Sequence, residues 1–328
     1  MSEASAKADA FVSAHLDEAA ALGERLADLT EEPELFLPAL REGLIELADP
    51  AYSDMAERAS PGTTAAYAVR GPLLIAVQRP LRAALHEGSS ISALRLAQHL
   101  VEAEDRDLRL FALPCLRRAL AQDPEQTWQL MRRMGGGAVD WIEVDSLADV
   151  WARGILAESF RWAELEQLIY SERTFERRLV PATLATIPHR LPTARRDELR
   201  PESVERALDM IGLLMGDAEE MVQKALSWAI REWTRVDAVV TAELLRLETD
   251  FAVQHRDGAR AWVIRDALSN QPPDLSTTLR EQLAGLRRDR NAPSTSIAAG
   301  QAASFAAVLA SSNDVVAAQG ARYTRSRA

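Results

Sequence analysis

The breaks between helical segments constrain the fold of this chain more than any other feature of its sequence. Prolines, glycines and polar clusters recur at intervals of roughly 12 to 20 residues, and the segments between them carry apolar residues at helical spacing. In residues 4–27, for example, Phe11, Leu22 and Leu26 fall on one stripe of a helix. No segment shows the sustained period-two alternation that is typical of strands. The sequence therefore predicts an all-α protein.

The expected helices follow one another with short connections. They cover residues 4–27, 34–48, 73–86, 91–104, 106–121, 124–134, 141–154, 156–170, 171–187, 201–215, 217–233, 236–255, 259–270 and 275–288. Residues 51–62 and 191–203 have the composition of exposed connections. Consecutive short helices with tight breaks are typical of an α-solenoid or of an irregular bundle.

The composition divides the chain into a helical domain and a tail. We expect one helical domain over residues 1–290, in which residues 1–60 form acidic N-terminal helices. From residue 291 onward Ala, Ser and Gly dominate, and large apolar residues such as Phe305 are few. Such a segment buries little apolar surface, so residues 291–328 are expected to be a disordered tail or to hold one weak helix.

The net charge of −11 is unevenly distributed along the chain. Residues 1–60 hold 14 acidic against 4 basic side chains, which leaves 35 acidic and 34 basic side chains in the remainder. An acidic protein is an unusual partner for nucleic acid. Because the acidic excess is confined to the N-terminal helices, the rest of the chain can still form a basic surface.

Three features indicate a compartment. No apolar run reaches the roughly 18 residues that a membrane helix needs. The N-terminus lacks the basic and apolar regions of a signal peptide. The single cysteine, Cys115, cannot form an intramolecular disulfide, which agrees with a reducing compartment. We expect a monomer without a membrane partner in the cytoplasm, that is, the bacterial cytosol or nucleoid.

The first candidate site is a helix start that follows three glycines, residues 135–137. Asp140 is a good N-cap, and Glu143 three residues later completes a capping box. Trp141 and Asp145 then lie on one face of the helix, because residues four apart are neighbours. A carboxylate kept ionised near the helix N-terminus and beside an indole could stabilise a cation. The alternative is a core tryptophan next to an aspartate that only complements the helix dipole.

The second candidate stretch is residues 171–178, where basic side chains cluster at a helix start. Arg177 and Arg178 could bind phosphate through planar, bidentate hydrogen bonds, and Phe175 lies nearly one turn before Arg178. The alternative is a solvated face whose arginines pair with Glu172 and Glu176.

The third candidate stretch, residues 223–233, places Lys224, Trp228 and Arg231 on one helical stripe. A cation, an indole and a second cation suit a polyanion that carries an exposed cationic or aromatic group. A buried indole with two snorkelling bases explains the stripe almost as well.

Other site chemistries lack their signatures. The histidines have no metal-ligand spacing, and one cysteine cannot build a zinc site. Glycine-rich nucleotide loops and a Gly-x-Ser-x-Gly elbow are absent from the sequence. We therefore expect neither a metal nor a cofactor.

Taken in order, the three stretches resemble the DNA alkylation repair family, HEAT-like-repeat DNA glycosylases that release cationic N3- and N7-alkylated purines. The matching motifs are Trp141-x-x-x-Asp145-Ser146, Phe175-x-x-Arg178 and Gln223-Lys224-Ala225-x-x-Trp228-x-x-Arg231-Glu232. Upstream, Tyr67-Ala68-Val69-Arg70-Gly71-Pro72 and the segment 94–118, with Glu102 and Arg109, are similar to earlier family helices. The resemblance covers roughly residues 60–270 and implies a HEAT-like α-solenoid of antiparallel helix pairs.

The resemblance also implies an activity and a set of roles. The substrate would be alkylated duplex DNA in base-excision repair, with 3-methyladenine or 7-methylguanine released and no metal or cofactor required. Asp145 would stabilise the positive charge that develops on the sugar, and Trp141 and Trp228 would pack around the lesion. Arg178 would hold a neighbouring phosphate. Further DNA contacts are expected from Arg177, Lys224 and Arg231.

The chain departs from the family pattern at Phe175, where the family has Trp, at Ser227, where it has Gly, and in its acidic charge. The main alternative function is a non-catalytic HEAT-like module that binds DNA structures or a protein partner. A purely protein-binding scaffold with a basic partner is a third interpretation. The enzyme hypothesis expects Trp141, Asp145, Arg178 and Trp228 to meet on one concave surface, with the acidic helices on the convex side or at one end.

Overall fold

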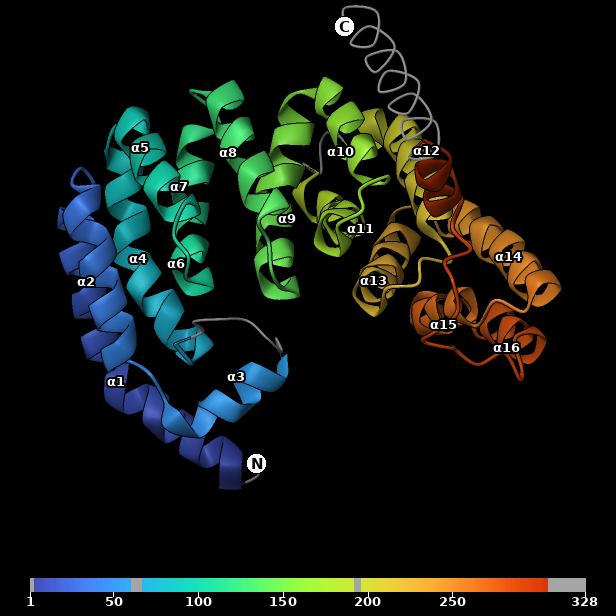
Figure 1. Ribbon diagram of the computed structural model, residues 1–328, viewed down its shortest axis with the longest axis horizontal. Helices are drawn as coiled ribbons and strands as arrows, with labels where there is room; N and C mark the ends of the chain where they lie inside the picture. Colours follow the sequence, from blue (N-terminus) through green and yellow to red (C-terminus); the bar gives the residue numbers. More distant parts are fainter. Residues whose placement is uncertain (1–2, 60–66, 192–195, 306–328) are drawn as a thin grey trace, which may run out of the picture. The chain divides into compact units, whose positions relative to one another are not determined.

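The computed structural model describes residues 3–59, 67–191 and 196–305. These residues form helices and contain no strand, so the all-α prediction is confirmed (Figure 1). The chain divides into two compact units, unit 1 from Met1 to Glu158 and unit 2 from Ser159 to Ala328. None of the described helices is both long and apolar enough to cross a membrane.

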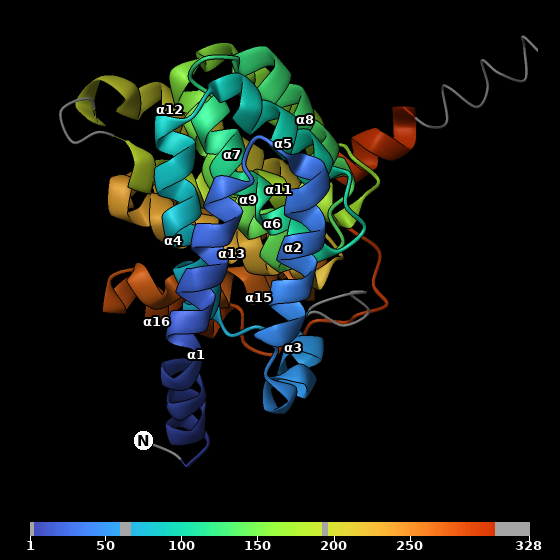
Figure 2. The same cartoon turned by 90° about the vertical axis from the view of Figure 1, so that its left-hand side faces the viewer.

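Unit 1 contains the first nine α-helices. Their bounds are α1 Glu3–Asp28, α2 Pro33–Glu46, η1 Pro50–Tyr52, α3 Ser53–Ala59, α4 Gly71–Glu87, α5 Ser90–Val101, α6 Arg106–Leu110, α7 Ala112–Ala119, α8 Pro124–Gly136 and α9 Trp141–Ala157. In one layer α1 packs on α4, α4 on α7 and α7 on α9, and in the other α2 packs on α5 and α5 on α8. Figure 2 shows α1 beside α4 at the start of this unit. Two layers that each follow chain order are the arrangement expected of a HEAT-like solenoid.

Tryptophan packing fixes the distance between α8 and α9. The rings of Trp128 and Trp151 are fully buried, with centroids 4.5 Å apart. A Cβ atom on Gly154 would lie 2.6 Å from the ring of Trp128, so this glycine allows the close approach of the two helices. Cys115 is buried in α7, and burial raises the pKa of its thiol to about 12.

Unit 2 repeats the two-layer arrangement. Its elements are η2 Ser159–Arg161, α10 Trp162–Leu168, α11 Thr174–Arg190, α12 Arg196–Leu214, α13 Glu220–Val236, α14 Ala238–His255, α15 Gly258–Ala267, η4 Leu268–Asn270 and α16 Pro273–Gln282. Here α11 packs on α13 and α13 on α15, while α12 packs on α14 and α14 on α16. Trp233 is fully buried in α13, and its indole N–H donates to the Leu184 carbonyl of α11 at 3.0 Å.

Part of the expected tail packs against unit 2. The Thr295 amide donates to the Gly216 carbonyl at 3.0 Å, and the Ser294 hydroxyl donates to the same oxygen at 3.1 Å. A helix runs from residue 297 to residue 305, where Phe305 lies edge-on to Tyr170. The composition predicts that this segment buries little apolar surface. In the structure it is held by hydrogen bonds from its polar groups to the backbone carbonyl of Gly216. Residues 306–328 lie outside the described residues.

The helix predictions differ from the structure in four places. The expected helix 156–170 is divided among the last two residues of α9, η2 and α10, which begins at Trp162. Residues 53–59 of the expected connection 51–62 form α3, and residues 196–203 of the second connection belong to α12. The expected helix 106–121 is two helices, α6 and α7, which meet at Phe111. The remaining parts of the two connections, residues 60–62 and 192–195, lie outside the described residues.

Candidate active site

The helix start at Trp141 is capped as the sequence predicts. The Asp140 carboxylate accepts a hydrogen bond from the Glu143 amide at 2.9 Å. The Glu143 carboxylate also accepts a hydrogen bond from the Val139 amide at 3.4 Å. The cap therefore fixes where α9 begins.

Two arginines of α6 hold this cap in place. Arg106 donates to Asp140 at 2.6 Å, and Arg109 donates to both carboxylate oxygens of Glu143 at 2.6 and 3.0 Å. All four side chains are buried. Burial raises the pKa of Glu143, although Arg109 opposes the shift. These pairs link the first turn of α9 to α6 and define its orientation within unit 1.

Trp141 and Asp145 lie on the open face of α9. Both side chains are half-buried, whereas Val144, Leu147 and Ala148 between and beyond them are fully buried. The two residues are four apart and therefore neighbours on the helix surface. The indole and the carboxylate therefore lie one turn apart on a half-buried face of α9, and their joint role as a site stays a prediction.

Arg178 occupies a more enclosed position than the expected phosphate contact requires. Its side chain is 5% exposed, and its guanidinium donates to the Met221 carbonyl of α13. Phe175, one turn earlier in α11, is half-buried. In this conformation Arg178 joins α11 to the first turn of α13, and its contact with DNA remains a prediction.

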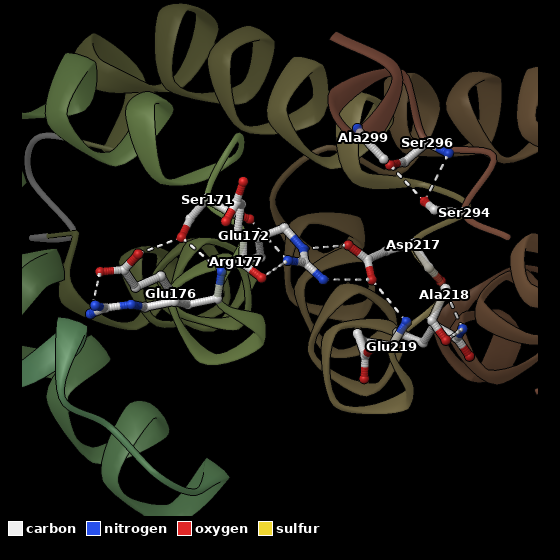
Figure 3. Close-up of polar contacts among 12 residues, drawn as sticks. Ser171, Glu172, Glu176, Arg177, Asp217, Ala218, Glu219, Ser294, Ser296 and Ala299 are labelled. Carbon is white, nitrogen blue, oxygen red and sulfur yellow. Dashed lines mark hydrogen bonds and ion pairs between the residues drawn. The ribbon is translucent and has the colours of Figure 1, made fainter. Parts of the chain in front are cut away.

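Arg177 is committed to contacts within unit 2 (Figure 3). One terminal nitrogen donates to the carbonyls of Ser171 and Glu172 at 2.9 and 3.0 Å. The other side of the guanidinium faces the buried carboxylate of Asp217, at 2.7 Å from Nε and 3.4 Å from Nη2. These bonds occupy the planar fork that was expected to bind phosphate.

The same pattern recurs at the fourth residue of three helices. Arg109 in α6, like Arg177 in α11, donates to the carbonyls six and five residues before it, those of Ala103 and Glu104, at 3.1 and 2.9 Å. Gln223 in α13 donates to the carbonyls of Asp217 and Ala218 at 2.7 and 3.2 Å. Each side chain then contacts a later segment: Glu143 for Arg109, Asp217 for Arg177 and Arg288 for Gln223. We call Arg109, Arg177 and Gln223 the ladder residues.

Sequence reasoning missed the ladder. The sequence pattern that marks a ladder residue is a long polar side chain at the fourth position of a helix. Two polar or small residues precede it, five and six positions earlier in the connection. That pattern is common, and the long-range partners that give it meaning lie 34 to 65 residues away.

The expected stripe of α13 is present. Lys224 is exposed and pairs with Glu220 at 2.9 Å, while Trp228 is half-buried. Arg231 donates to the carboxylate of Asp266 at 2.6 Å. Burial opposes ionisation of Asp266, but hydrogen bonds from Ser227 and Arg231 prevail and lower its pKa. Both cations are thus held in place by carboxylates at the edges of an accessible indole.

Trp141 and Asp145 belong to unit 1, whereas Arg178, Trp228 and the α13 cations belong to unit 2. That these side chains meet at one surface stays a prediction. Among the described residues, no group of three or more His, Cys, Asp or Glu side chains could hold a metal ion.

The fold and the site first define a class: an all-α helical-repeat protein that presents an indole and a carboxylate at a capped helix start. The family described as "DNA alkylation repair enzyme" matches residues 40–270, most of the chain. The chain belongs to this family. No curated protein and no solved structure matches it.

Proposed function

We propose that the chain is a monofunctional DNA glycosylase that excises cationic N3- and N7-alkylated purines from duplex DNA in base-excision repair. The observation that carries the proposal is the Trp141 and Asp145 pair, half-buried on the open face of α9 in a member of the DNA alkylation repair enzymes. The buried pairs to Arg106 and Arg109 support it, because a catalytic carboxylate has to be held in a fixed position.

The chemistry follows from the substrate. An alkylated N3 or N7 purine is already cationic, so its glycosidic bond breaks without a strong general acid. The bonding electrons pass to the base, which leaves neutral, and positive charge develops on the deoxyribose. The carboxylate of Asp145 stabilises that charge and positions a water molecule. The water oxygen bonds to C1′ of the sugar, and its proton passes to Asp145 or to solvent.

The aromatic and basic side chains supply binding. Trp141 and Trp228 pack against the sugar and the lesion, and their rings favour a cationic base over a neutral one. Lys224 and Arg231 lie near backbone phosphates. Arg178 holds a phosphate beside the lesion, and the bond from one of its guanidinium nitrogens to the Met221 carbonyl fixes the side chain at the start of α13.

The test is to incubate purified protein with methylated duplex DNA and to measure release of 7-methylguanine and 3-methyladenine. We expect release by the wild-type protein and loss of release by Asp145→Asn. The matched control is Asp274→Asn, which changes an exposed aspartate in the first turn of α16. Release that is unchanged in Asp145→Asn would contradict the mechanism. Binding without release from any variant would support the non-catalytic DNA-binding module instead.

A further inference from the structure

A basic cavity lies within unit 1, on the same layer of helices as α9. It has a volume of about 350 Å³ between α4 and α7, and its lining residues are Arg82, Leu85, His86, Pro114, Arg117 and Arg118. All of its polar lining side chains are basic. We call it the α4–α7 cavity.

The charge around the cavity is only partly compensated. Asp149 of α9 accepts from Arg117 at 2.9 Å and also pairs with Arg153 at 3.2 Å. Arg118 donates to two backbone carbonyls, and Arg82 donates to the neutral amide of Gln78. Arg117 and Arg153 share one carboxylate, and Arg82 and Arg118 bind neutral groups, so these four arginines and Asp149 sum to a net charge of +3 with His86 neutral.

The electrostatics of Arg117 reflect this excess. Burial lowers its pKa first, Asp149 opposes the shift, and the positive charges of Arg82 and Arg153 lower the pKa further. Like charges held together at a partly desolvated site are stabilised by an anion that enters it.

The position of the cavity relative to Asp145 is set by α9. Asp145, Asp149 and Arg153 follow at four-residue intervals and lie on the same face of the helix. At 1.5 Å per residue, Arg153 lies about 12 Å along the axis from Asp145. Successive phosphates of one strand advance by about 3.4 Å along a duplex, so a duplex that contacts Asp145 can also reach the cavity with a phosphate a few nucleotides away.

We propose that the α4–α7 cavity, with Arg153 at its edge, binds a backbone phosphate of the same duplex a few nucleotides from the lesion. The inference rests on the proposed function and extends the DNA-binding surface into unit 1. It also explains how a protein with a net charge of −11 can bind DNA, because the basic side chains of the cavity offset the acidity of residues 1–60 at the place where the duplex binds. Arg82 and Arg153, both exposed, make the phosphate contacts, while Arg117 and Arg118 shape the cavity.

The test compares the salt dependence of binding to an undamaged duplex. The double variant Arg82→Gln/Arg153→Gln removes two exposed charges of the cavity. The control Arg95→Gln/Arg133→Gln removes two exposed charges from α5 and α8, in the other layer of unit 1. Each lost phosphate contact lowers the slope of log K against log salt concentration by about 0.9. We expect the cavity variant, which loses one phosphate contact, to lower the slope by about 1 and the control to leave it unchanged.

Three results overturn the inference, and they are distinguishable. Equal slopes for all three proteins, with wild-type protein that binds DNA and releases methylated bases, reject the cavity but leave the proposed function intact. A wild-type protein that binds no DNA rejects both. If millimolar inorganic phosphate raises the melting temperature of wild-type protein but not of the cavity variant, while the DNA slopes stay equal, the cavity takes free phosphate and not DNA.

Discussion

At the scale of single residues, the first turns of α9 divide their carboxylates between structure and chemistry. Asp140 and Glu143 are buried and paired with the α6 arginines, whereas Asp145 reaches the half-exposed face. The charges of Asp140 and Glu143 therefore hold the helix start in place, whereas the carboxylate of Asp145 lies toward the surface.

The Arg109 and Glu143 pair gives a stability prediction. Glu143 is fully buried, so Arg109→Leu leaves a buried carboxylate without its cation and should cost about 3 to 5 kcal/mol in the free energy of unfolding. The double variant Arg109→Leu/Glu143→Leu should recover most of that loss. Urea denaturation measures both. A double variant as unstable as the single one would contradict the account.

The same pair predicts a pH dependence. Burial raises the pKa of Glu143, so the folded state binds this proton more tightly than the unfolded state does. Stability linked to this group is therefore fully present below the unfolded-state pKa and is lost as the pH rises through the raised folded-state pKa. Without Arg109 the shift is larger, so Arg109→Leu should lose less stability at pH 5 than at pH 7, measured by denaturation at the two values. A larger loss of stability at pH 5 than at pH 7 would contradict the prediction that burial raises the pKa of Glu143.

At the scale of elements, the ladder residues connect each helix start to the preceding connection and to a later segment. Arg109, Arg177 and Gln223 make the same two backbone contacts although their side chains differ. A structural repeat is therefore visible in these hydrogen bonds at the starts of three helices, although the three side chains differ. It also explains why Arg177, expected to bind DNA, has its guanidinium fork occupied.

Substitution of Arg177 tests how much its ladder contacts contribute to the stability of unit 2. Arg177→Ala leaves the buried Asp217 without its cation and should lower stability by about 3 to 5 kcal/mol. Arg177→Gln keeps donors for the two backbone carbonyls, as Gln223 does, and should lose less. Thermal unfolding of both variants checks the order. Equal losses would mean that the backbone contacts contribute little.

The contact between α8 and α9 depends on Gly154. Gly154→Ala places a methyl group 2.6 Å from the Trp128 ring, and overpacking of this kind costs about 1 to 3 kcal/mol. The control Gly137→Ala meets its nearest atom at 3.5 Å, an ordinary contact, and should be nearly neutral. Melting temperatures of the two variants provide the comparison, and a Gly154→Ala protein as stable as Gly137→Ala would contradict the packing.

Helix positions could be predicted well because periodicity and caps are local. The start of α9 at Trp141 followed from Asp140, and the α13 stripe followed from spacing. The helix α3 was missed because the Ser, Pro and Gly content of residues 51–62 indicates a connection. The burial of Arg178 could not be predicted, because it depends on the Met221 carbonyl 43 residues later.

At the scale of the whole molecule, the distribution of charge decides whether an acidic protein can bind DNA. Residues 1–60 account for nearly all of the net charge. Surface charges farther apart than about 10 Å are largely screened at 0.1 M salt. Because α1 packs on α4, which lines the α4–α7 cavity, the acidic helices are compatible with DNA binding only if their exposed carboxylates lie on the side of α1 away from the duplex, beyond this distance.

This arrangement gives a prediction for α1. Asp17, Glu18 and Glu24 are exposed, so Asp17→Asn/Glu18→Gln/Glu24→Gln removes three negative charges with little effect on packing. We expect duplex affinity at 0.15 M salt to change less than about twofold, since screening limits the effect. A large gain in affinity would place the acidic helices beside the DNA.

The central claim is that Asp145 acts on the sugar of an alkylated nucleotide. The most direct measurement is the single-turnover rate of base release from a duplex with one 7-methylguanine, compared between wild-type protein and Asp145→Asn at saturating protein. Loss of a charge that stabilises the transition state should slow release by about 100-fold or more, with the melting temperature unchanged. Equal rates for the two proteins would contradict the account.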